Sequence, residues 1–295
     1  MVSNSTQLSA LSRLFSSSVF RELAGRGKSA LFSRLVRETS LHHTCPGNSL
    51  VAEVFETALS ILRTGRHRDE YVYKAALTQK VLLGTHSLKT ACMINEFRVA
   101  DCKADLVILN GTAAVYEIKS ERDSLTRLAR QIAAYKKVFA RVNVIAGENH
   151  VDAVHSSTPE DVGVLCLSKR NQISTLREAQ DLPERICPLS VFDAIRTKEA
   201  EDILDELGVT VPKVPNTVLR SMLREHFAKL RPADLHLQMV RTLKRTRNLM
   251  PLEHLIDRLP SSLHAAALYV PMRKDDHEKV VRAVSTSFRE ALEWA

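Results

Sequence analysis

Long apolar runs, paired cysteines and aromatic residues are all scarce in this sequence. No stretch approaches the roughly 18 uninterrupted apolar residues that a membrane-spanning helix requires, so we expect no membrane partner. The five cysteines are widely spaced and include no C-x-x-C pair, which excludes a disulfide framework or zinc knuckle and suits a reducing cytoplasm. Aromatic residues form 5% of the chain, too few to favour a stacking platform for single-stranded nucleic acid.

Three short patterns that can mark a function lack the context that the function needs. Gly27-Lys28-Ser29 ends like a phosphate-binding loop, but Glu22 stands where the leading glycine belongs. His42, His43 and Cys45 lie close together without a second cluster of metal ligands. The serine- and arginine-rich N-terminus lacks the apolar core and cleavage site of a secretory signal. We therefore expect a cytoplasmic protein.

The net charge of +8 is concentrated at the two ends of the chain. The segment from Lys213 to Arg247 contains nine basic and two acidic residues, and the first forty residues contain six basic and two acidic residues. Basic surfaces attract phosphates, so nucleic acid is an expected partner. Ordinary solvated helix faces would give the same composition.

The pattern along the chain predicts an α/β fold in three parts. They are an N-terminal helical segment (1–48) broken near Gly25-Arg26-Gly27, a core (49–188), and a basic helical region (189–295) with a linker candidate at Val211–Pro215. Within the core we expect helices over 51–63, 70–83 and 123–139, the last capped by Asp123, and strands over 95–109, 113–119, 142–146 and 162–167.

Ionisable residues interrupt two strands of this core that are otherwise apolar. Alternation places Glu117 and Lys119 on one face of their strand, and Asp105 lies in the strand before it. Charged groups in such positions are expensive to bury unless they bind something. They therefore predict a functional site, although a structural salt-bridge network would also explain them.

The turn between these strands decides whether the three residues can meet. A two-residue turn at Asn110-Gly111 pairs positions whose numbers sum to 221, which puts Asp105 and Glu117 on opposite faces. A three-residue connection through Thr112 gives the sum 222 and sets Asp105 across from Glu117. A shared site requires the odd-length connection.

The residue types fit metal-dependent phosphodiester hydrolysis. Asp105 and Glu117 could bind Mg²⁺ or Mn²⁺, with Glu96 as a further carboxylate ligand, while Lys119 positions the attacking water. The tripeptide Glu117-Ile118-Lys119 is by itself weak evidence for a nuclease, since a second [DE]-x-K pattern occurs at Asp101 to Lys103. Context strengthens it, because Gln131 and Tyr135 follow on one helical face; Tyr135 also fits that helix's apolar stripe.

Taken together, these motifs resemble a bacterial and prophage-associated group within the PD-(D/E)XK nuclease superfamily. The resemblance covers about residues 68–170 and rests on Asn95-Glu96-Phe97-Arg98, Lys103–Val107, Tyr116–Glu121, Asp123–Leu125, Arg127-Leu128 and Gln131-x-x-x-Tyr135, the last similar to a motif of RecB-like members. It departs from the superfamily pattern in that Ala104, not proline, precedes Asp105. It implies a restriction-endonuclease-like mixed sheet flanked by helices, with Gln131, Tyr135 and Arg98 contacting nucleic acid.

Two functions are carried forward from the sequence. The first is a metal-dependent nuclease with DNA as the expected substrate and RNA left open; double-strand cleavage would favour a homodimer. Phage defence, prophage maintenance and DNA repair would all use such a site. The second is a non-catalytic nucleic-acid- or protein-binding module built on a relic nuclease core.

Overall fold

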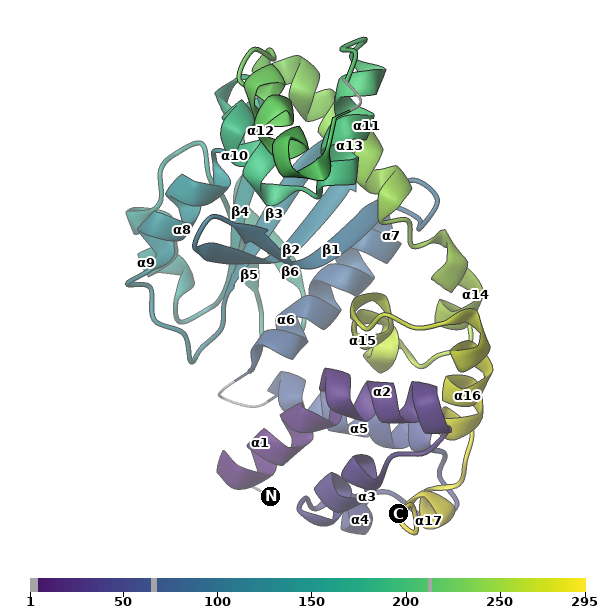
Figure 1. Ribbon diagram of the computed structural model, residues 1–295. Coiled ribbons are helices and arrows are strands. Elements are labelled where there is room, and N and C mark those ends of the chain that lie inside the picture. The colour runs from purple at the N-terminus through teal and green to yellow at the C-terminus, as the bar shows by residue number, and fades with distance from the viewer. Residues whose placement is uncertain (1–4, 65–67, 212–213) are drawn as a thin grey trace.

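A six-stranded mixed sheet lies at the centre of the computed structural model, which describes residues 5–64, 68–211 and 214–295 (Figure 1). The strands follow chain order across the sheet: β1 (Cys92–Val99), β2 (Cys102–Asn110), β3 (Thr112–Lys119), β4 (Arg141–Gly147), β5 (Gly163–Leu167) and β6 (Ile173–Arg177). Strands β1 to β3 form an antiparallel meander, β3 to β5 are parallel, and β6 is antiparallel to β5. The α/β prediction is confirmed at this level.

Helices surround the sheet. Those before it are α1 (Ser5–Leu14), α2 (Ser17–Arg26), α3 (Ala30–Arg37), α4 (Leu41–Thr44), α5 (Val51–Thr64) and α6 (Glu70–Leu77), the last continued by the π-helical turn η1 (Thr78–Leu82) and α7 (Leu83–Thr85). Between strands lie α8 (Leu128–Tyr135) and α9 (Val151–Ser157). After the sheet come α10 (Pro188–Ala194), α11 (Thr197–Glu206), α12 (Asn216–Phe227), α13 (Pro232–Thr246), α14 (Glu253–Ile256), α15 (His264–Tyr269), α16 (Lys274–Val284) and α17 (Phe288–Ala291). Short 3₁₀ turns occur at Pro183–Arg185, Met250–Leu252 and Ser261–Leu263.

The β2–β3 hairpin has the odd-length connection that a shared site requires. Asn110 pairs with Thr112, Gly111 stands alone at the tip with φ 72°, and the register continues to the Leu106–Tyr116 pair. A positive φ is the conformation that glycine tolerates best, which explains the residue at the tip. The numbers of paired residues therefore sum to 222 throughout the hairpin. One position beyond the last regular pair, this register brings Asp105 level with Glu117.

Several predicted boundaries are wrong. The single strand predicted over 95–109 is two strands, β1 and β2, which meet at a turn where Ala100 has φ 52°. The helix predicted over 123–139 is reduced to α8, and Asp123 caps a turn instead, accepting hydrogen bonds from the Ser120 backbone and hydroxyl. Strand β6 was not predicted, and residues 5–48 of the N-terminal segment contain four helices instead of the two expected.

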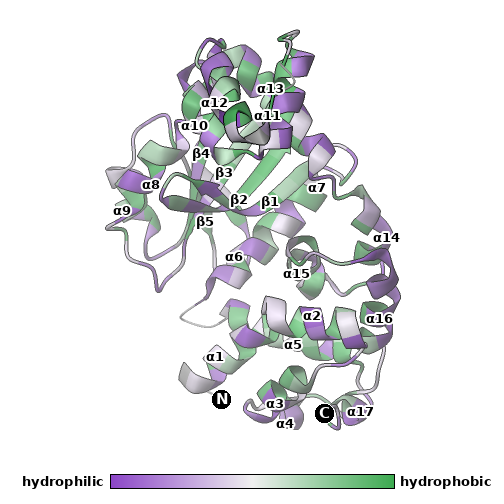
Figure 2. Cartoon of the chain, viewed as in Figure 1, coloured by the Kyte–Doolittle hydropathy of each residue, from purple (hydrophilic) through white to green (hydrophobic). Residues whose placement is uncertain are grey.

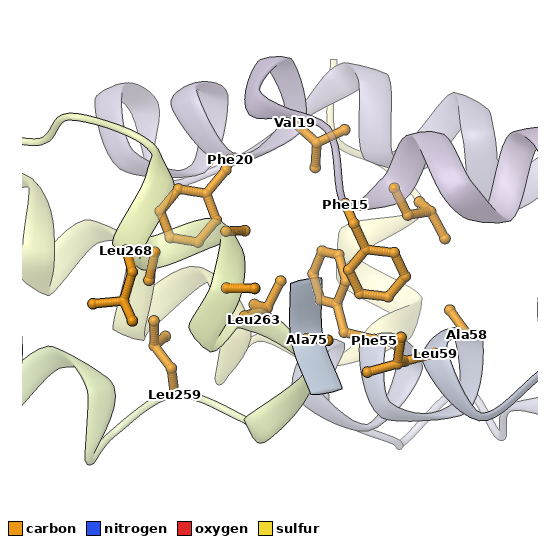
Figure 3. Close-up of a cluster of buried hydrophobic side chains, with 14 of the residues drawn as sticks. Phe15, Val19, Phe20, Phe55, Ala58, Leu59, Ala75, Leu259, Leu263 and Leu268 are labelled. Carbon is orange, nitrogen blue, oxygen red and sulfur yellow. The ribbon is translucent and has the colours of Figure 1, made fainter. Parts of the chain in front are cut away.

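Two hydrophobic cores lie on opposite faces of the sheet. One packs helices from both ends of the chain against the face that carries Leu106 and Ile108. Figure 3 shows part of it, with Phe15 beside Phe55, and Phe20 and Leu263 among the other labelled side chains. The other packs α8 and α10 to α13 against the face that carries Val107 and Val115. Figure 2 shows green apolar residues on the strands and on inner helix surfaces, with purple polar residues outside.

The two ends of the chain meet in the first core. Leu50 forms a β-bridge with Ser287, and the Phe288 amide donates to the Ser49 carbonyl at 2.7 Å. Helices α16 and α2 also pack together, so the predicted C-terminal region (189–295) is divided between the two cores. Of the predicted linker Val211–Pro215, residues 212 and 213 lie outside the described residues.

Candidate functional site

Asp105, Glu117, Lys119 and Gln131 line one cavity of about 280 Å³. The cavity lies where β3 ends, between the β2–β3 hairpin and α8. Its polar wall includes a carboxylate from the first turn of α6, that of Glu70. The structure therefore brings together three residues predicted as the catalytic core and one of the predicted nucleic-acid contacts.

Glu117 is the centre of a buried hydrogen-bond network. Its side chain is 2% exposed, and its Oε1 accepts from Lys119 Nζ at 2.9 Å and from Gln131 Nε2. Tyr135 donates its hydroxyl hydrogen to the other oxygen, Oε2, at 2.8 Å. Lys119, 4% exposed, also donates to Gln131 Oε1 at 3.0 Å. A buried carboxylate held this way is fixed in orientation.

Asp105 marks a break in strand alternation. In a regular strand Ala104 and Leu106 would lie on the same face, but Ala104 packs in the second core and Leu106 in the first. Val107 packs in the second core again. At this break the Asp105 carboxylate turns to accept the Ile118 amide at 2.8 Å through Oδ2. Burial and then the charge of Glu117 raise its pKa to about 8. Two carboxylates thus share one site without enough cationic charge to hold both ionised easily.

The predicted nucleic-acid contacts are placed differently from one another. Tyr135 is fully buried, and Gln131 is 8% exposed. Both donate hydrogen bonds to the Glu117 carboxylate and so position it. Tyr135 also donates to the Lys103 carbonyl at 3.1 Å. Arg98 is exposed on β1 and is not among the residues that line the cavity.

Glu96 does not line the cavity, whereas Glu70, which was not predicted as a site residue, does. Glu96 adopts φ 54°, and its carboxylate lies 3.0 Å from Lys103 Nζ. Partial burial would raise the pKa of Glu96, but hydrogen bonds from Lys103 and Tyr269 lower it. Glu70 was missed because a glutamate after the N-cap Asp69 is ordinary helix capping sequence. Nothing in the local pattern distinguished it.

Among residues 5–64, 68–211 and 214–295, no group of three or more histidine, cysteine, aspartate or glutamate side chains is arranged to hold a metal ion. His42, His43 and Cys45 therefore form no such group. Asp105 and Glu117 remain as two carboxylates in one cavity.

The comparisons with known proteins identify the family. The family described as Bacteriophage P4 protein cII matches residues 63–254, about two thirds of the sequence. The chain belongs to this family. Protein cII of Enterobacteria phage P4 is 33% identical over 129 residues, which are 42% of this chain and 48% of that relative. The chain thus aligns with about half the length of that relative, and no solved structure matches.

A second buried ion pair lies beside the cavity, within the region that matches the cII family. Arg68 is 2% exposed, and its guanidinium donates to Glu121 Oε1 and to the carbonyls of Leu167 and Ser168, each at 2.7 Å. Tyr73 donates to Glu121 Oε2 at 3.0 Å. Arg68 therefore joins the start of α6 to the segment after β3 and the end of β5.

Most arginines in the basic segment of this cII-family chain already have intramolecular partners. Arg224 pairs with Asp193, Arg231 lies 3.6 Å from Asp234, Arg245 pairs with Asp202 and Glu206, and Arg247 with Glu199. Lys213 lies outside the described residues. The local charge excess is thus partly neutralised within the fold, which reduces the positive potential available to a phosphate backbone.

No helix in the described part of the chain has both the length and the apolar character needed to cross a bilayer.

Proposed function

We propose that this protein is a metal-dependent phosphodiesterase, a nuclease with DNA as its expected substrate. The observation that carries the proposal is the meeting of Asp105, Glu117 and Lys119 in one cavity, through a hairpin register fixed by Gly111. The mixed sheet and the cover of helices support a restriction-endonuclease-like fold. The phage relative supports a role linked to phage or prophage.

The donor set fits a magnesium ion. Mg²⁺ is commonly held by one or two carboxylates and completes its shell with water and substrate phosphate oxygens, so two ligands suffice. Asp105 uses Oδ2 to accept the Ile118 amide, and the hydrogen bonds of the described residues leave its Oδ1 free. The ion would polarise a phosphate oxygen and acidify a bound water.

Lys119 and Gln131 give the site its orientation. The Lys119 ammonium donates two of its three hydrogens, to Glu117 and Gln131, which leaves the third for a water or phosphate oxygen in the cavity. A fixed ammonium beside a phosphate stabilises the negative charge that grows there during hydrolysis. Tyr135 and Gln131 hold Glu117 so that its carboxylate does not turn away from the cavity.

Cleavage assays with a matched control test this proposal. Double-stranded DNA, single-stranded DNA and RNA would be incubated with Mg²⁺, Mn²⁺ or a chelator, using wild type, Asp105→Ala and Lys119→Ala. We expect metal-dependent cleavage that both variants lose. Lys137→Ala, an exposed lysine just after α8, should retain it. Metal-independent cleavage, or equal activity in all the proteins, would contradict the proposal.

One observation favours the alternative of a non-catalytic binding module. Both oxygens of Glu117 already accept hydrogen bonds within the protein, as expected for a network that serves structure alone. Binding to duplex DNA measured over a range of salt concentrations distinguishes the two functions. Tight, strongly salt-dependent binding with no turnover under any metal would support the binding module.

A further inference from the structure

A second pocket, of about 240 Å³, lies next to the candidate site. Its walls come from the segment around the end of α1, from α6 and β1, and from α15. Glu70 lines both this pocket and the catalytic cavity, so the two are neighbours. The pocket is smaller than the roughly 300–1,000 Å³ of sites for drug-sized ligands, so it suits a single ring system.

Aromatic rings are concentrated in this pocket, although they are scarce in the sequence. Phe15 and Tyr71 are stacked with centroids 4.5 Å apart, and Tyr71 is fixed by donating to the Ser262 carbonyl at 2.6 Å. Half-buried Tyr269 forms another part of the wall. Phe15 is buried and supports one face of Tyr71, whereas Tyr71 and Tyr269 are both partly exposed, so ring surface remains on which a planar ligand can stack at low entropic cost.

The charges of the pocket favour a ligand that donates hydrogen bonds. Lys74 is paired with Glu70 at 2.6 Å and lies over the Tyr269 ring, 5.4 Å from its centroid, so its charge is partly neutralised. Glu96, whose carboxylate is paired with Lys103 at 3.0 Å, also lines the pocket, together with serine residues. An anionic phosphate would meet net negative charge here, whereas an amino group would find acceptors.

We infer that this pocket binds one nucleobase of the substrate, a base with an exocyclic amino group, while the adjoining phosphodiester lies in the catalytic cavity. This inference rests on the proposed function. A carboxylate accepts hydrogen bonds from such an amino group. A single stacked base needs only a pocket of this kind, and not the extended stacking platform that the low aromatic content argues against.

The pocket is completed by residues outside the family match. Glu70, Tyr71 and Glu96 lie within residues 63–254, but Phe15 and Tyr269 come from the two ends of the chain. Base preference would therefore depend on helices outside the segment that matches the family.

Binding of short fluorescein-labelled single strands, measured by anisotropy with chelator present to prevent cleavage, tests the inference. Strands of deoxycytidine, deoxyadenosine and thymidine would be compared with a strand of abasic sites. We expect the cytosine and adenine strands to bind most tightly, and Tyr269→Ala to weaken their binding about tenfold while leaving the abasic strand unchanged.

Tyr269→Phe is the matched control, because it keeps the ring and removes the hydroxyl that bonds to Glu96. It should bind like wild type, and thermal melting would show that both variants fold. Equal binding of all strands, equal binding by Tyr269→Ala, or no binding at all would overturn the inference. The nuclease proposal is judged separately, by metal-dependent cleavage of the same strands.

Discussion

Two buried ion-pair clusters lie on either side of the end of β3, and they differ in one respect. The pair Arg68–Glu121 is enclosed by protein, and its guanidinium reaches two backbone carbonyls as well as the carboxylate. The pair Lys119–Glu117 borders a cavity that contains a second carboxylate, that of Asp105. Both pairs are almost completely buried, so burial and pairing alone do not indicate function.

The difference shows which feature separates a structural pair from a candidate site. In the Arg68 cluster the guanidinium and the carboxylate are both almost fully buried, and each has its hydrogen-bond partners within the protein. In the Lys119 cluster, the ion pair borders a cavity that the carboxylates of Asp105 and Glu70 also line, and burial and the charge of Glu117 raise the pKa of Asp105. Unbalanced charge beside a cavity is what a bound cation would neutralise.

The largest expected effect is on stability, from Arg68→Met. The change leaves Glu121 and the carbonyls of Leu167 and Ser168 buried without their donor, so the free energy of unfolding should fall by about 3–5 kcal/mol. Urea denaturation measures this. Lys119→Met should cost less because water can enter its cavity. Equal losses in the two variants would remove the distinction between the clusters.

The next effect is on activity, from Asp105→Asn. On the proposed function, removal of this carboxylate should reduce the cleavage rate about a hundred- to a thousandfold. The melting temperature should stay the same or rise, because a neutral amide replaces a carboxyl whose charged form is disfavoured by burial. Glu121→Gln should show the opposite, with reduced stability and normal cleavage per folded molecule. A large loss of activity in Glu121→Gln would contradict the comparison.

A smaller effect is expected from Gly147→Ala. A Cβ at this position would lie 2.7 Å from both Glu121 Oε1 and the Tyr73 hydroxyl, so the Arg68 cluster would have to shift. We expect a loss of about 1–3 kcal/mol in the free energy of unfolding, measured by urea denaturation. Gly25→Ala is the control: nothing lies within 4 Å of its Cβ, and the change should stabilise α2 slightly.

The smallest effect concerns His236, which lies at the other end of β3. Its Nε2 accepts the Ala113 amide at 3.2 Å, and burial lowers its pKa despite the nearby charge of Asp181. A lowered pKa in the folded state means that this contact stabilises the protein above the ordinary histidine pKa of about 6.5 and loses its effect as pH falls below it. Urea midpoints should therefore decrease on acidification, and less so in His236→Gln. An identical pH profile in the two proteins would count against this assignment.

The sequence predicted the placement of the candidate site residues correctly where it depends on the residues next to them in the same strand. Alternation in β3 predicted that Glu117 and Lys119 share a face. The sequence left two connections open at Asn110-Gly111, and the structure shows the odd-length one that Asp105 needs to reach the same cavity. Glu96 was misplaced because its positive φ breaks the alternation of β1, which no residue pattern announces for a glutamate. Arg68 was missed because its hydrogen-bond partners are distant in sequence, and Glu70 because the strands and the helix that form the rest of its cavity are distant in sequence.

The bridge between Leu50 and Ser287 has a consequence for synthesis of the chain. Helices α1 to α5 are made first, but the partners of their apolar faces, α15 to α17, are made last. Contacts of such long sequence separation form slowly, and exposed apolar surface promotes aggregation in the interval. The first core is therefore completed only after the ribosome has released residues near 290, and a nascent chain halted after α13 would have the site hairpin and the second core but not the C-terminal helices of the first core.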